Sequence, residues 1–328
     1  MQLWTIVGAI GRFMMRGGVV ILLFVAYQLW GTGLSTARAQ DNLTNKFNTQ
    51  IAEFTPPPTP TEVAPTETEP VVTATADLPI PEPGDPIARI TMTTINSDFV
   101  MVQGVDLKWL QKGPGHFPQT PLPGQPGNAS VAGHRTTYQA PFHRIDELVP
   151  GDIITVQTLQ GTFTYKVDTY IDPKDGTASG HIIVSPDDLF ILDQNVGNRL
   201  TLMSCHPKFS AAQRIVVTAT LASNPAPATP IPVYDGVTTD ASADVLAGGD
   251  SSAWPAAIAW SLLTGLVWFG TWWLAHFWTP SLLRERAQRV TRFRDWKFLT
   301  TYAIGTPIVL VMMFFAFINI ARLLPAAY

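Results

Sequence analysis

Three side chains in this sequence have the types and spacing of a thiol-based acyl-transfer site. Cys205 is the only cysteine in 328 residues, and it ends a strand-like run at residues 200–204. Arg214 follows nine residues later at the start of a second strand-like run, and His134 lies 71 residues upstream in a glycine-marked turn. A single thiol cannot form an intrachain disulfide. Cysteine, histidine and arginine together supply a nucleophile, a proton carrier and a group that stabilises an anion.

Cys205 also has a structural interpretation, because a lone cysteine is usually a small buried hydrophobe. Its neighbourhood favours chemistry instead. The run from Thr201 to Cys205 reads Thr-Leu-Met-Ser-Cys, and Arg214 follows it. This pattern resembles the signature of the sortases, the cysteine transpeptidases of bacterial surfaces, whose usual form is Thr-Leu-x-Thr-Cys with an arginine shortly after. Ser204 replaces the usual threonine but keeps the hydroxyl.

Further motifs extend the resemblance over residues 86–221. They follow in the sortase order and are Gly113 to Phe117, Pro123 to Asn128, Ala132 to Tyr138, Pro141-Phe142 and Leu148 to Asp152. The Gly-His-Arg-Thr-Thr-Tyr stretch at residues 133–138 is typical of class E, or of the neighbouring class D. Gln139 is a departure, because class E members usually carry glycine there.

The resemblance implies a role for each reactive group. Cys205 is expected to attack the Thr-Gly bond of a Leu-(Ala or Pro)-x-Thr-Gly sorting signal, held rigidly at a strand end and facing outward. His134 is expected to give its proton to the departing glycine amine and to accept one from the incoming amine. Arg214 is expected to bind the substrate carbonyl and to stabilise the tetrahedral oxyanion.

Tyr138, Ser204 and His206 are the expected substrate-binding residues. In family terms, a tyrosine near the catalytic histidine alters the floor that a kinked proline would occupy. Tyr138 therefore predicts a preference for Ala over Pro at the second position of the signal.

The other histidines and the acidic loops predict no further site. His116 is interpreted as structural support for a loop near the site, and His143 and His181 as surface residues. No His/Asp/Glu cluster has zinc spacing. Four loop carboxylates could suggest calcium but are interpreted as solvated turns: Asp172, Asp175, Asp187 and Asp188. No metal and no cofactor are therefore expected.

The middle of the chain predicts a mainly β fold. Strands are expected at 87–95, 99–102, 153–159, 162–171, 182–185, 189–192, 199–204 and 215–221, with a helical turn at 107–111. Proline and glycine mark the joins. This pattern predicts a small closed β-barrel over residues 87–222. The sortase resemblance specifies eight strands with short helices in the connections.

Three apolar runs predict transmembrane helices in addition to the barrel. They lie at residues 17–34 (within an N-terminal segment 1–34), 254–278 and 299–324. Each approaches or exceeds the ~20 residues that cross ~30 Å of hydrocarbon. The connection at 279–298 is basic and predicts a cytoplasmic loop under the positive-inside rule. The N-terminus is then inside, and residues 35–253 are outside the cell membrane.

The first apolar run has a second interpretation. Arg12 and Arg16 precede it, and Ala37-Arg38-Ala39 follows it, which also fits a cleaved secretory signal. Retention as an anchor is the favoured alternative.

Two linkers are predicted to connect the barrel to the membrane. Residues 35–86 contain an amphipathic helix at 42–54, interpreted as lying near the bilayer or pairing with another copy, and a proline-rich stretch at 55–86. Residues 223–253 form the second linker, which is predicted to be flexible.

The charge distribution agrees with a cell-surface domain. Residues 35–253 hold 23 of the 25 acidic residues beside 12 of the 21 lysines and arginines, which makes nucleic-acid binding unlikely. The expected partners are surface proteins with sorting signals, an amine acceptor (a cell-wall precursor or a pilin lysine) and membrane lipid. The alternative function is an inactive surface-binding module on the same barrel.

Overall fold

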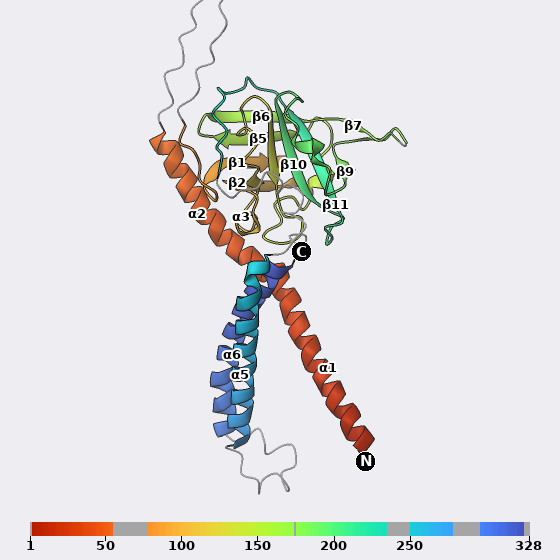
Figure 1. Cartoon of the computed structure of the whole chain (residues 1–328), viewed down its shortest axis with the longest axis vertical. Helices are drawn as coiled ribbons and strands as arrows, with labels where there is room; N and C mark the ends of the chain where they lie inside the picture. Colours follow the sequence, from red (N-terminus) through yellow and green to blue (C-terminus); the bar gives the residue numbers. More distant parts are fainter. Residues whose placement is uncertain (1, 55–77, 174, 235–249, 278–295, 325–328) are drawn as a thin grey trace, which may run out of the picture. The chain divides into compact units, whose positions relative to one another are not determined.

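The computed structural model describes residues 2–54, 78–173, 175–234, 250–277 and 296–324, which form two compact units (Figure 1). One unit contains the described residues from 28 to 234, and the other contains residues 2–27 and 250–324. The proline-rich stretch at 55–77 and most of the predicted basic loop lie outside the described residues.

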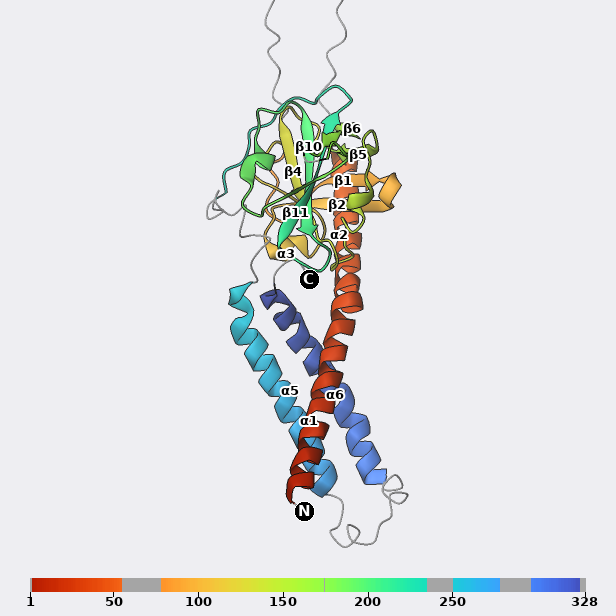
Figure 2. The ribbon, with the colours of Figure 1, turned by 90° about the vertical axis from the view of Figure 1, so that its right-hand side faces the viewer.

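The first unit is a closed eight-stranded β-barrel (Figures 1 and 2). Its strands are β1 (Pro86–Met92), β2 (Ser97–Gln103), β3 (Gly115–His116), β4 (Asn128–Ala132), β5 (Ile153–Thr158), β6 (Gly161–Val167), β10 (Arg199–His206) and β11 (Gln213–Leu221). The order around the ring is β10-β4-β3-β2-β1-β5-β6-β11, and β11 pairs back with β10. The predicted mainly β fold and the eight-stranded barrel are confirmed.

Short elements fill the connections. They are α3 (Leu107–Leu110), η2 (Thr93–Ile95), η3 (Ile145–Glu147), η4 (Leu189–Leu192), β7 (Tyr170–Ile171), β8 (Ala178–Ser179) and β9 (Ile182–Val184), which extends the sheet beside β11. The strand predicted at 189–192 is wrong, because this segment is a 3₁₀ helix. The predicted strand at 162–171 ends at Val167, and β7 pairs instead with β8. A four-residue apolar run does not distinguish strand from helix by periodicity.

Alternation along the strands separates the barrel interior from its outer face. Leu202 of β10 and Val217 of β11 are fully buried in the interior core. Their neighbours Met203 and Val216 belong to a second apolar cluster on the outer face. Cys205 follows Met203 by two residues and therefore lies on the outer side.

A long helix covers part of this outer face. The amphipathic helix predicted at 42–54 is confirmed as part of α2 (Thr32–Glu53). Its apolar side chains Leu43 and Phe47 are buried in a cluster with β2, so they pack on the barrel rather than on the bilayer or another copy. The side chain of Gln40 adds three hydrogen bonds to barrel backbone.

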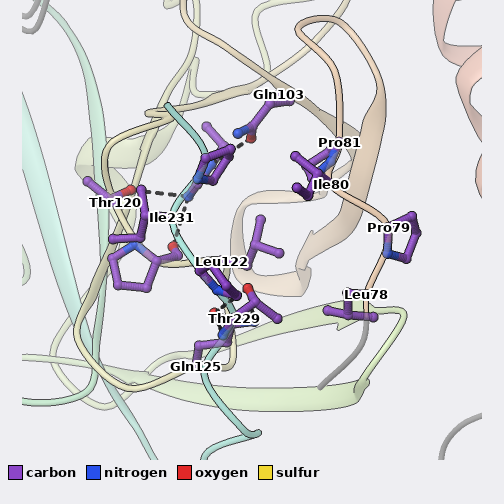
Figure 3. Close-up of a pocket in the computed structure, with 14 residues that line it drawn as sticks. Leu78, Pro79, Ile80, Pro81, Gln103, Thr120, Leu122, Gln125, Thr229 and Ile231 are labelled. Carbon is purple, nitrogen blue, oxygen red and sulfur yellow. Dashed lines mark hydrogen bonds between the residues drawn. The ribbon is translucent and has the colours of Figure 1, made fainter. Parts of the chain in front are cut away.

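The first residues of the linker after the barrel pack against the barrel unit. Residues 223–234, predicted to be flexible, cross one end of the barrel. Gln125 donates a hydrogen bond to Thr229 Oγ1 (3.0 Å), and the Tyr234 hydroxyl donates to the Pro81 carbonyl. Residues 229–232 of this segment and residues 78–81 before β1 both line a small cavity of about 30 Å³ (Figure 3). The packed domain therefore extends past residue 222.

The second unit consists of three helices, α1 (Gln2–Ala26), α5 (Trp254–Phe277) and α6 (Trp296–Leu323). Helices α5 and α6 pack along each other, and Trp260 stacks on Phe315 at 4.8 Å between ring centroids. Both helices are long and apolar enough to cross a membrane.

The structure corrects the prediction of three spans. Among the described residues, two helices pass the length and hydropathy test, not three. The apolar part of α1 covers only Met14–Ala26, and a π-helical turn follows at Tyr27–Gly31. Thr32 already belongs to α2 and packs with the barrel unit. The predicted run at 17–34 is therefore divided between the two units.

Candidate active site

Cys205 and Arg214 are directly opposite each other on neighbouring antiparallel strands. The β10–β11 register pairs their Cα atoms, and cross-strand partners point to the same face of a sheet. Each residue is only 2% exposed. Cys205 therefore lies on the outer face of the barrel, as expected, but it is buried from solvent.

His134 reaches the same region from the other neighbour of β10. Strand β4 runs parallel to β10 and pairs Ala132 with Met203. The Gly133 amide continues this ladder by donating to the Met203 carbonyl (3.0 Å). His134 is the next residue, and it is 3% exposed. The three reactive groups thus come from three adjacent strands of one ring.

Gly133 is required by close packing. A Cβ atom at this position would lie 2.6 Å from the ring of Phe142, which is fully buried in the barrel core. The loop that carries His134 can therefore approach the barrel end only with glycine at this position.

Arg214 has a donor available on its guanidinium. Its Nη1 donates to the carbonyls of Ala211 (2.9 Å) and Gln213 (3.0 Å), which fixes the plane of the group. Its Nη2 is buried and has no hydrogen-bond partner among the described residues. Burial lowers the pKa of Arg214, while Cys205 and Asp187 oppose that shift. A buried donor without an acceptor suits an oxyanion that exists only during a reaction.

The thiol is held mainly in its neutral form. Burial raises the pKa of Cys205, and the charges of Arg214 and Arg135 partly counteract this effect. The thiolate is therefore a minor species at neutral pH, so a proton acceptor is needed during attack.

The loop after His134 has an unusual backbone. Tyr138, Gln139 and Ala140 have φ angles of 54°, 61° and 45°. Each such residue costs on the order of 1–3 kcal/mol unless its surroundings compensate. The left-handed φ of Gln139 explains the glycine that class E sequences usually carry there. The ring of Tyr138 lies over His134, with 4.8 Å between centroids.

The other predicted substrate-binding residues differ in exposure. Ser204 is fully buried, and its hydroxyl donates to the Gly133 carbonyl (2.7 Å), so it supports the site rather than facing a substrate. His206 is half-buried at the end of β10, and burial is the main cause of its lowered pKa.

His116 is structural, as predicted. It is fully buried, its Nε2 lies 2.8 Å from the Pro121 carbonyl, and its Nδ1 lies 2.8 Å from the side-chain amide of Gln103. Burial lowers its pKa to about 4. His143 is exposed as predicted, whereas His181 is half-buried.

Arg135 is the residue that sequence reasoning missed. Its side chain is 1% exposed, and it donates to the carbonyl of Cys205 (3.1 Å). The signal was present in the motif, since an arginine directly after the histidine belongs to the quoted class E pattern.

A cavity of about 390 Å³ lies on the outer face of β10 and β11, and its described lining includes none of the three reactive residues. Thr201 of β10 and Val216 of β11 form part of its floor, and both share the face of Cys205 by alternation. His181 and Phe190 of the connection between β6 and β10 form part of its wall. Among the described residues, no group of three or more His, Cys, Asp or Glu side chains could hold a metal ion.

Fold and site together define a closed β-barrel protein with a buried, cysteine-centred site. The family described as Sortase domain matches residues 90–222. Sortase SrtE1 of Streptomyces coelicolor is 28% identical over 224 residues, covering 64% of this chain and 55% of that protein. Sortase D of Bacillus subtilis is 32% identical over 128 residues, covering 39% of this chain and 58% of that protein.

One solved structure is also similar in sequence. A Clostridium perfringens Sortase D5 transpeptidase is 32% identical, with a TM-score of 0.38, covering 44% of this chain and 83% of that chain. The sortase family thus matches the barrel region of this chain, and the two curated relatives are named as sortases E and D. The matches span just over half the length of the two curated relatives above.

Proposed function

We propose that this protein is a membrane-anchored sortase that cleaves a Leu-(Ala or Pro)-x-Thr-Gly signal and transfers the protein to an amine. The observation that carries the proposal is the cross-strand pair of Cys205 and Arg214, with His134 two residues after the end of the other neighbouring strand, β4. The cavity beside Thr201 and Val216 takes the peptide segment that precedes the scissile bond.

The chemistry proceeds in two acyl transfers. The Cys205 thiol gives its proton to His134 as the sulfur attacks the threonine carbonyl carbon, and the carbonyl oxygen becomes an anion that the free donor of Arg214 stabilises. The carbon–nitrogen bond breaks as His134 protonates the departing glycine amine, which leaves a thioester. An incoming amine then loses a proton to His134, attacks the thioester carbon and releases the Cys205 thiol.

Helices α5 and α6 anchor the protein in this proposal, with their connecting loop in the cytoplasm and the barrel outside. The N-terminal segment is retained. Ala39, the predicted cleavage position, lies inside α2, and cleavage there would separate Thr36 from Gln40, both of which bind the barrel unit.

Peptide turnover tests the proposal. The full chain in detergent is incubated with a Leu-Ala-x-Thr-Gly peptide and an oligoglycine amine. We expect a thioacyl adduct on Cys205 by mass spectrometry, a ligated product, and neither with Cys205→Ala. An inactive binding module would instead bind the peptide without forming an adduct, and that result would reject the enzyme.

Signal preference is tested in the same reaction. Leu-Ala-x-Thr-Gly and Leu-Pro-x-Thr-Gly peptides compete, and their kcat/KM ratio reports specificity. The position of Tyr138 over His134 supports a preference for Ala. A clear preference for Pro would reject this specificity but leave the sortase assignment intact.

A further inference from the structure

Arg135 is a buried cation directly after His134. Its guanidinium contacts three groups from different parts of the site. Nε donates to the His143 carbonyl (3.0 Å), Nη1 donates to the Cys205 carbonyl (3.1 Å), and Nη2 lies 2.9 Å from the Asp146 carboxylate.

These contacts join the two segments that carry the reactive groups. The loop around His134 and the end of β10 are 70 residues apart in the sequence, and Arg135 binds the backbone of the second from within the first. His143 Nδ1 lies 2.9 Å from the Arg135 carbonyl, so the loop also closes on itself. The planar fork of arginine can reach several acceptors in fixed directions, which lysine cannot do.

The positive charge of Arg135 is only partly neutralised. Asp146 is its ion-pair partner, but this carboxylate is 37% exposed and also lies 3.8 Å from Lys208 Nζ. Burying a cation is costly unless it is paired and hydrogen-bonded, so an apolar side chain would serve a purely structural role at lower cost. Arg135 therefore brings a net positive field to the end of β10.

We propose that Arg135 is a positioning residue that fixes the backbone of Cys205 relative to His134 and supplies a second cation beside the thiolate. Arg214 is the first cation, on the opposite strand. The inference deepens the proposed function and rests on it for the catalytic consequence, whereas the effect on the thiol can be measured without turnover.

Several other charged and titratable groups lie around the thiol and Arg135. They are Arg214 near the thiol, with Asp187 near Arg214, and Asp146, Lys208, His181 and His206 near Arg135, with His134 directly before it in the chain. Variants at Arg135 keep all of these side chains, and Asp146 is the one that loses its ion-pair partner in Arg135→Gln, so a change in the thiol is attributed to the loss of this guanidinium and its pair.

The test compares Arg135→Gln, Arg135→Lys and the control Arg144→Gln in the full chain. Arg144 lies on the same loop, but its side chain is 45% exposed and pairs locally with Glu147. The readouts are the pH dependence of iodoacetamide alkylation of Cys205, kcat/KM for peptide ligation, and the unfolding temperature.

We expect Arg135→Gln to move the alkylation midpoint to higher pH and to reduce kcat/KM by about 100-fold. Arg135→Lys keeps the charge and loses the fork, so its midpoint stays closer to the wild type while kcat/KM falls by about 10-fold. Arg144→Gln changes none of the three readouts.

A folded Arg135→Gln protein with a wild-type alkylation midpoint would overturn the charge effect. Wild-type kcat/KM in Arg135→Lys would overturn the positioning effect, and this variant decides the matter if the glutamine variant does not fold. If the wild type shows no ligation at all, the proposed function fails, and the alkylation profile still tests the role of the cation.

Discussion

Ser204 donates a 2.7 Å hydrogen bond to the carbonyl of Gly133, and both groups are buried between β4 and β10. The bond connects the residue before the nucleophile to the residue before the proposed proton carrier. It therefore sets the relative position of Cys205 and His134 without touching a substrate.

Removal of this hydroxyl is predicted to impair both ligation and stability. Ser204→Ala leaves a buried carbonyl without a donor, which costs about 1–3 kcal/mol in the free energy of unfolding. A shift of the histidine loop is expected to lower kcat/KM by about 10- to 100-fold. Ser204→Thr keeps the hydroxyl and should retain most activity. Full kcat/KM in the alanine variant would show that the bond does not position the site.

The thiol is predicted to ionise at higher pH than an ordinary cysteine. Because burial favours the neutral form, the fraction of thiolate, and with it the alkylation rate, should rise only above the usual cysteine pKa of about 8.5. Arg214→Gln should move the midpoint further up, since it removes a stabilising cation. Cys205 is the only thiol, so the urea-unfolded chain supplies the reference. A folded-state midpoint below this reference contradicts the prediction.

Helix α2 is predicted to depend on Gln40 for its attachment. The Gln40 side-chain amide donates to the backbone carbonyls of Val100 (2.9 Å) and Lys112 (2.7 Å). Its oxygen accepts a hydrogen bond from the backbone N–H of Val100 (2.8 Å). Gln40→Ala should cost about 2–4 kcal/mol and increase amide hydrogen exchange across residues 32–53. Asn48→Ala, at an exposed position of the same helix, is the control. Equal exchange in both variants would mean that the apolar face alone holds the helix.

Acid is predicted to destabilise the barrel through His116. Its pKa is about 4 in the folded state and about 6.5 when unfolded. Between these values the unfolded chain binds the proton and the folded chain does not, so stability falls as pH decreases from 6.5 to 4, by about 3 kcal/mol in total. His116→Gln should flatten the unfolding temperature over this interval, and His143→Gln, at an exposed position, should not. An unchanged profile in the His116 variant would place the acid sensitivity elsewhere.

The sequence predicted the strands whose side chains alternate clearly. The hairpin of β5 and β6 and the strands β10 and β11 follow apolar and polar alternation, so their approximate positions were predictable. Strand β4 was missed because its residues, Asn-Ala-Ser-Val-Ala, are mostly small and follow a proline-rich segment. This strand places His134, so the arrangement of the site depended on an element that propensity does not indicate.

The reactive residue types were predictable, but their surroundings were not. Cys205 is buried in the folded chain, and the contact of Arg135 with the Cys205 carbonyl spans 70 residues. The apolar run at 17–34 was read as one span because hydropathy alone does not show that Thr32 packs on a barrel. Such contacts depend on the tertiary fold rather than on local pattern.

Because β10 pairs with both β4 and β11, the reactive groups come together only when the barrel folds. Strand β10 has β4 on one side and β11 on the other, and the pairing of β10 with β11 closes the ring. Until it forms, the thiol, the imidazole and the guanidinium belong to three unconnected segments, and loop closure over some 70 residues must come first. Before the ring closes, Cys205 therefore lacks the neighbouring imidazole and guanidinium that the proposed acyl transfer needs, although its exposed thiol is easier to ionise than in the folded barrel.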